Sequence, residues 1–126
     1  MTRDELDAAT DEQLNEMAAK NIMGWTIRNH RMPDDEYVSI WYSDDGLHAP
    51  ACEDWSPATS WDDAGKLVEK MRENGLHAKV DDEVDVYYAA FSTRDGRGIA
   101  CTARHPSAPR AITTAALLAW EAKEKA

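Results

Sequence analysis

The stretch from Val84 to Phe91 is apolar on both of the faces that a β-strand would have. In an extended chain, one face would carry Val84, Val86, Tyr88 and Ala90, and the other Tyr87, Ala89 and Phe91. Residues 36–43 show the same two-sided pattern. Such strands are typical of sheets that are covered on both faces. We therefore expect one sheet with helices on both sides of it.

Three amphipathic segments could supply that cover, namely 10–23, 61–74 and 108–123. Thr10 and Gln13 have the spacing of a capping box at the start of the first segment. Ser60 is a suitable N-cap for the second, and Pro109 fits the first turn of the third. Gly24 is expected to end the first helix with a positive φ.

Five short strands complete the prediction, at 25–28, 36–43, 76–80, 84–91 and 98–103. The Asp95-Gly96 turn favours an antiparallel meander of the last three. The predicted fold is α+β: a three-layer α-β-α sandwich in the order αββαβββα. Its sheet is largely antiparallel, with about five strands and three helices, in a single domain over 1–126. The 44–60 stretch is a long loop, either functional or held on the core by Trp55.

A chain of 126 residues can build a core without metal or disulfide cross-links. No apolar run approaches a membrane span, and the first residues lack an apolar export signal. We therefore expect no membrane partner and a reducing, cytoplasmic location. Cys52 and Cys101 should be free thiols. The four histidines are isolated, so neither a metal site nor a cofactor is expected.

The net charge of −10 argues against binding to duplex DNA, because phosphate neutralisation needs a basic face. The charge is uneven along the chain. Residues 34–63 hold nine acidic residues and no Lys or Arg, whereas residues 92–126 hold six basic residues and three acidic ones. The acidic stretch is either solvated surface or a surface for a partner.

Catalytic motifs are missing from the sequence: there is no Gly-x-Ser-x-Gly, no Gly-x-x-x-x-Gly-Lys-Ser/Thr and no His-Glu-x-x-His. We therefore expect a non-enzymatic protein. The best candidate site is an anion site at the helix that begins near Ser107, where backbone N–H groups and a positive dipole end are available. Its cationic residues would be Arg94, Arg97, Arg104, His105 and Arg110.

Trp25, Trp55 and Trp61 could supply stacking surfaces beside such a site. Both sets of residues also have structural interpretations. The tryptophans could be core anchors, and Arg104 and Arg110 could pair with surface carboxylates. The aromatic content and the broad apolar face of the last helix also predict a homo-oligomer.

Three stretches together resemble the phage α-β-α sandwich domain family. They are Asn21-Ile22-Met23-Gly24-Trp25, the run from Trp55 to Met71 beginning Trp-Ser-Pro-Ala-Thr-Ser-Trp-Asp-Asp-Ala-Gly, and Ala108-Pro109-Arg110-Ala111-Ile112 with Ala115-Ala116-Leu117-Leu118-Ala119. The middle stretch is also similar to the NinX family of lambdoid phages. The resemblance implies a bacteriophage or prophage origin, a host bacterial cytoplasm and a helix-sheet-helix sandwich. It implies no catalytic residues.

In that setting, the cationic and aromatic residues suggest a counter-defence protein that sequesters a small anionic ligand, such as a nucleotide signal. A second hypothesis is a protein-binding module that inhibits or redirects a host protein through the acidic 34–63 surface. A third is a small structural or assembly accessory.

Overall fold

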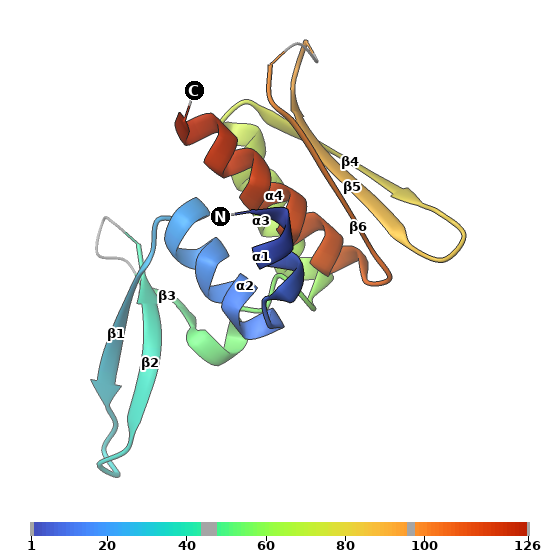
Figure 1. Cartoon of the computed structure of the whole chain (residues 1–126). Helices are drawn as coiled ribbons and strands as arrows, with labels where there is room; N and C mark the ends of the chain where they lie inside the picture. Colours follow the sequence, from blue (N-terminus) through green and yellow to red (C-terminus); the bar gives the residue numbers. More distant parts are fainter. Residues whose placement is uncertain (1, 44–47, 96–97, 126) are drawn as a thin grey trace.

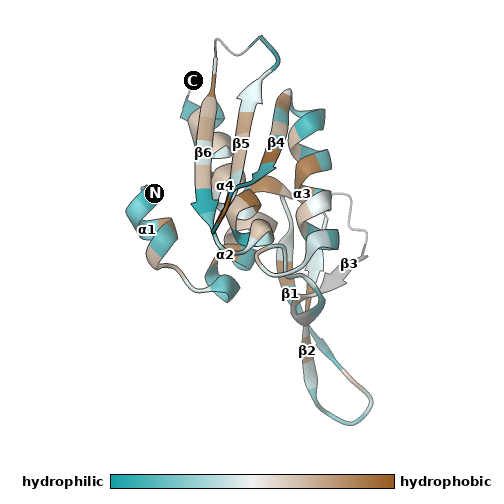
Figure 2. Ribbon diagram, turned by 90° about the vertical axis from the view of Figure 1, so that its right-hand side faces the viewer, coloured by the Kyte–Doolittle hydropathy of each residue, from teal (hydrophilic) through white to brown (hydrophobic). Residues whose placement is uncertain are grey.

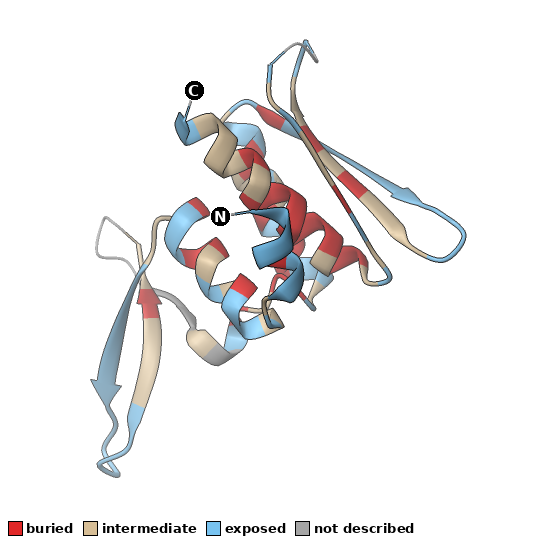
Figure 3. Cartoon of the chain, viewed as in Figure 1, coloured by how far each residue is buried: buried red, intermediate tan, exposed pale blue. Residues whose placement is uncertain are grey.

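Helix α4 (Ala108–Lys125) is the centre of the fold. The computed structural model describes residues 2–43, 48–95 and 98–125. In it α4 packs against β5 (Tyr87–Thr93) and β6 (Ala100–His105), and also against α3 (Trp61–Glu73) (Figure 1). Its buried face is built largely of small side chains, Ala111, Ala115, Ala116 and Ala119. These residues let neighbouring backbones approach closely, and Figure 3 shows the resulting buried band along α4.

Two short helices, α1 (Arg3–Ala8) and α2 (Asp11–Met17), contact α4 through a separate part of its surface. The predicted capping box of α2 is confirmed. The Gln13 backbone N–H donates to Thr10 Oγ1 (3.1 Å), and the Thr10 N–H donates to Gln13 Oε1 (2.9 Å). The helix continues as a π-helical turn over Ala18–Ile22. Gly24 follows with φ 71°, as expected for a helix-ending glycine.

The first sheet has the order β1-β2-β3, with β1 at Thr26–Arg31, β2 at Tyr37–Tyr42 and β3 at His48–Ala51. β1 and β2 pair antiparallel, with Ile27 opposite Trp41 and Arg31 opposite Tyr37. Within β1 and β2 only Trp41 is buried. The β1–β2 hairpin extends away from the helices (Figure 1).

The second sheet has the order β4-β5-β6 and includes β4 at Leu76–Asp82. All its pairings are antiparallel and regular, with Phe91 of β5 opposite both Ala78 and Cys101. Phe91, Ala89 and Ala103 are buried on the face toward α4, and Leu67 and Met71 of α3 join the same core. Figure 2 shows apolar residues in these strands and in α4, whereas α1 is mostly hydrophilic.

The α+β class and the antiparallel pairing are confirmed, but the strands are distributed differently from the prediction. The six strands of the described residues form two three-stranded sheets instead of one sheet of about five. The residues after β2 explain the division, because β2 pairs with β3 within the 44–60 stretch and not with the later meander. That stretch also holds a 3₁₀ turn, Cys52–Asp54, so it is not a plain loop.

The expectation that helices cover both faces of the 84–91 strand does not fit the second sheet. The described helices lie on one side of β4-β5-β6 (Figure 1). Tyr88 lies on the other side, where the Arg104 guanidinium carbon is 4.8 Å from the centre of its ring. A long arginine side chain thus shields part of that outer face. Val84 is fully exposed because the strand begins only at Tyr87, after a turn.

The helix boundaries agree closely with the prediction. Segment 61–74 is α3, segment 108–123 lies within α4, and segment 10–23 comprises α2 and the π-helical turn. The apolar face of α4 is buried inside its own chain, so it does not by itself support the predicted homo-oligomer. Gly96 of the predicted hairpin turn lies outside the described residues.

Candidate functional site

Two of the three candidate tryptophans meet in the core. The rings of Trp25 and Trp55 are in edge-to-face contact with centroids 4.8 Å apart. Trp55 is almost completely buried, and its Nε1–H donates to the carbonyl of Asn15 at 3.0 Å. This arrangement joins α2 to the segment before α3, so it supports the interpretation of these residues as core anchors.

Trp61 lies elsewhere. It is the first residue of α3, it is 58% exposed, and its ring meets Tyr87 edge-on with centroids 6.1 Å apart. The chain therefore does not gather the three tryptophans around one ligand site.

Arg104 lies on the outer face of the second sheet. Its Nε donates to Glu83 Oε1 at 2.9 Å, and its guanidinium lies over Tyr88. His105 follows on β6, and its Nδ1 accepts a hydrogen bond from the Ser107 backbone N–H at 2.9 Å. Both side chains thus have interactions within the chain.

Arg110 points to the opposite side of the fold. Its side chain is 12% exposed, and Nη1 is 2.7 Å from Asp11 Oδ1. Nη2 lies 2.7–3.3 Å from three backbone carbonyl oxygens, those of Leu6 and Asp7 in the last turn of α1 and that of Ala9 just after it. These contacts hold the two N-terminal helices against α4.

Arg94 is exposed at the end of β5, and Arg97 lies outside the described residues. The cationic residues that are close in sequence are therefore spread over the outer sheet face, a hairpin end and a buried helix contact. The described residues do not assemble them into one anion site.

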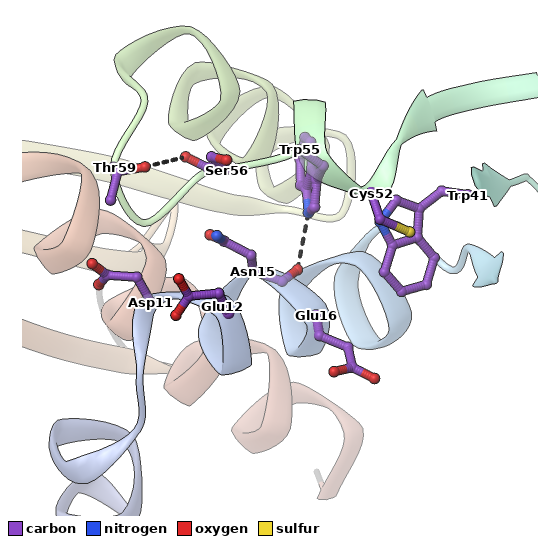
Figure 4. A pocket seen from close by; sticks show the side chains of 9 residues that line it. All are labelled: Asp11, Glu12, Asn15, Glu16, Trp41, Cys52, Trp55, Ser56 and Thr59. Atoms are coloured by element: carbon purple, nitrogen blue, oxygen red, sulfur yellow. Dashed lines mark hydrogen bonds between the residues drawn. The ribbon is translucent and has the colours of Figure 1, made fainter. Parts of the chain in front are cut away.

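The structure instead presents an acidic cleft between α2 and the segment 52–59, with a volume of about 510 Å³ (Figure 4). The cleft is lined by Asp11, Glu12, Asn15, Glu16, Trp41, Cys52, Trp55, Ser56 and Thr59. Carboxylates from one helix lie along one side, and the other side carries Trp41, Trp55 and the Cys52 thiol. Within this set, only Trp55 is a site residue predicted from the sequence.

Helical spacing explains the acidic side of the cleft. Glu12 and Glu16 are four residues apart in α2, which is about one helical turn. They therefore project from the same face of the helix. The first-turn acids Asp11 and Glu12 are also favoured by the positive end of the helix. The signal in the sequence is the acidic first turn of a capped helix. This pattern is common on solvated surfaces, so it does not distinguish a helix that lines a cleft from one that faces solvent.

Asn15 fixes the opposite wall. Its side-chain Oδ1 accepts a hydrogen bond from the Ala58 backbone N–H at 2.9 Å, and its own carbonyl accepts from Trp55. Farther along, the buried Asp63 carboxylate accepts from the Ser56 N–H at 2.9 Å. Hydrogen bonds from α2 and from α3 therefore fix the position of this wall, and the cleft is preformed.

The charges in the cleft are only partly balanced. Asp11 is paired with Arg110, and Glu16 lies 2.6 Å from Lys20 Nζ. Among the described residues Glu12 has no ion-pair partner. Burial, together with the negative charge of Glu16, raises the pKa of the Cys52 thiol. The neutral thiol and the indole groups give an apolar wall opposite the carboxylates.

This arrangement favours a cationic group with an apolar stem, such as the side chain of lysine or arginine. It is chemically the reverse of the predicted anion site. Within the described residues, no three His, Cys, Asp or Glu side chains are placed to hold a metal ion. Cys52 and Cys101 are both free.

The structure is an α+β domain with an acidic cleft beside α2. Comparison with protein families then identifies it more closely: the model of the phage ABA sandwich domain matches residues 16–117. The chain belongs to this family, as the resemblance of its three stretches predicted. Comparisons with curated proteins and with solved structures find no match.

None of the helices in the described part of the chain has both the length and the apolar character that a membrane span requires.

Proposed function

We propose that this bacteriophage protein is a non-enzymatic accessory protein that acts in the host cytoplasm by binding a basic segment of a host protein in its acidic cleft. The observation that carries the proposal is the placement of Glu12 and Glu16 opposite the apolar wall of Trp41 and Cys52. A host protein inhibited or redirected in this way would suit either a counter-defence or an assembly role.

Charge supports this choice of partner. A cleft lined by one sign of charge inside a protein of net charge −10 attracts cations and raises their local concentration. The volume of about 510 Å³ accommodates one or two long basic side chains of a peptide. In this proposal, the acidic surface that binds a host protein belongs to α2 and not to the 34–63 stretch that the sequence suggested.

The alternative, sequestration of a small anionic ligand, has less support. Arg110 already binds Asp11 and three carbonyl oxygens, and Arg104 binds Glu83. A phosphate would have to displace these partners at two separated places. The carboxylates of the cleft would repel it.

Fluorescence anisotropy with two labelled peptides tests the proposal. One peptide alternates arginine and serine, and the other alternates glutamate and serine. The full chain should bind the basic peptide alone, with an affinity that falls as salt rises, because screening weakens exposed charge contacts.

The Glu12→Gln, Glu16→Gln double variant should bind the basic peptide about tenfold more weakly or worse, since two charge contacts are lost. The matched control is Glu69→Gln, Glu73→Gln, which removes the same charge from exposed positions of α3. If both variants weakened peptide binding equally, the effect would be one of general charge. That result would overturn the proposal that the peptide binds in the cleft. If the full chain bound a nucleotide from a panel but did not bind the basic peptide, the anionic-ligand alternative would be favoured.

A further inference from the structure

Strand β4 (Leu76–Asp82) is an edge strand of the second sheet, and every residue after Leu76 is exposed. Its pairing with β5 is regular, without a bulge. The strand contains no proline. Such an edge has backbone N–H and C=O groups free to pair with another strand.

The hydrogen-bond pattern shows which residues direct these groups outward. The Glu83 N–H donates to the Val86 carbonyl at 2.9 Å, in the same register in which Asp82 lies opposite Tyr87. Hydrogen-bonded and non-hydrogen-bonded pairs alternate along an antiparallel ladder. The odd-numbered residues of β4 therefore bond to β5, and Ala78, Val80 and Asp82 direct their backbone groups to the free edge.

Apolar side chains adjoin this edge. Val80 is 38% exposed on the face that carries the helices, although a valine in a strand is usually buried. Asp82, two residues farther on the same face, lies opposite Tyr87, whose ring contacts the exposed Trp61. Val80 and Trp61 are thus exposed apolar side chains toward the end of β4, and Tyr87 beside Trp61 is partly buried.

We propose that β4 pairs antiparallel with β4 of a second copy of this chain, about a two-fold axis at Val80, to form a continuous six-stranded sheet. A two-fold axis through an antiparallel sheet places one residue opposite itself. With Val80 at the axis, Lys79 lies opposite Asp81 of the second copy, and Asp81 lies opposite Lys79.

Charge complementarity selects this register. A shift of the axis to Lys79 or to Asp81 would place like charges directly opposite each other, which is unfavourable. An axis at Ala78 would place His77 opposite Lys79. In the Val80 register, the Lys79–Asp81 pairs are non-hydrogen-bonded, so their side chains are close. Each Lys79 is already 3.6 Å from Asp81 of its own chain, and pairing joins the four charges into one network.

The inference is independent of the cleft, which is formed by α2 and the segment 52–59. The homo-oligomer expected from the aromatic content and from the broad apolar face of the last helix would form instead through β4.

Sedimentation equilibrium of the full chain from about 1 to 100 μM tests the proposal, in the range of weak to moderate self-association. The wild type should form dimers. Lys79→Asp places Asp opposite Asp81 in both halves and should weaken dimerisation about tenfold or more. The double variant Lys79→Asp, Asp81→Lys restores opposite charges across the axis and should dimerise again. The matched control Lys70→Asp, on α3, should dimerise like the wild type.

Val80→Pro provides a test that does not depend on charge. Its missing N–H points to the free edge, so the β4–β5 ladder keeps its bonds, while the contact with a second copy loses two. Circular dichroism would show that the fold is retained. A wild-type monomer at 100 μM, or a dimer that neither Lys79→Asp nor Val80→Pro weakens, would overturn the proposal.

Discussion

The guanidinium of Arg110 and the carboxylate of Asp11 lie 2.7 Å apart, although 99 residues separate them in the sequence. The same guanidinium binds carbonyl oxygens in the last turn of α1 and that of Ala9 just after it, the last at 2.7 Å. One side chain therefore satisfies backbone acceptors at the end of α1 and a charge at the start of α2.

Arg110→Ala should destabilise the protein by about 2–4 kcal/mol, because it leaves several polar groups without a partner in a mostly buried place. Arg104→Ala should cost less than about 1 kcal/mol, since the Arg104–Glu83 pair is exposed. Urea unfolding of the two variants gives the comparison. Similar losses for both would contradict the structural role of Arg110.

Asn15→Ala should lower the free energy of unfolding by about 1–2 kcal/mol, because the Ala58 N–H loses its acceptor. Asn15→Asp keeps an oxygen at this position and should lose much less. Thermal unfolding followed by tryptophan fluorescence measures the difference. If the aspartate variant lost as much stability as the alanine variant, the hydrogen bond would not explain the effect.

The Cys52 thiol should ionise above its ordinary range, because burial and the charge of Glu16 both raise its pKa. In a Cys101→Ala background, the rate of alkylation by iodoacetamide against pH should have a high midpoint. Since the thiolate is the reactive form, alkylation near neutral pH should be slow. Glu16→Gln should move the midpoint to lower pH, whereas Glu69→Gln should leave it in place. An unchanged midpoint in Glu16→Gln would show that the charge of Glu16 does not raise the pKa of the Cys52 thiol.

Gly65 and Gly75 form a matched pair for testing backbone conformation. A Cβ atom added at either position would meet nothing within 4 Å, but Gly75 has φ 83°. Gly65→Ala, inside α3, should stabilise the protein by about 0.4–1 kcal/mol. Gly75→Ala should destabilise it by about 1–2 kcal/mol. Differential scanning calorimetry measures both, and equal shifts of the melting temperature would contradict the prediction.

Local signals predicted the helices well. The capping hydrogen bonds of Thr10, Gln13 and Ser60 join residues three positions apart, so these caps can be predicted from the sequence alone. The division into two sheets could not be predicted in this way. The two-sided apolar pattern of 84–91 indicates partial cover but not its source, which for Tyr88 is the side chain of Arg104.

The candidate site shows the same limit. Arg104 and Arg110 are neighbours in the sequence, but they belong to a strand and a helix that point to different sides of the fold. Conversely, Glu12 and Cys52 are far apart in the sequence and line one cleft. The hydrogen bonds of Asn15 with the 55–58 segment help to bring these elements together, and no local pattern encodes that contact.

The central position of α4 has a consequence for biosynthesis. The N-terminal helices, β5 and β6 pack on residues 108–125, which are synthesised after all of these elements. Until then, Leu14, Phe91 and Leu67 lack the surface that buries them. The earlier elements therefore cannot complete their core before α4 has been synthesised, and docking of α4 should limit the rate at which the native state forms.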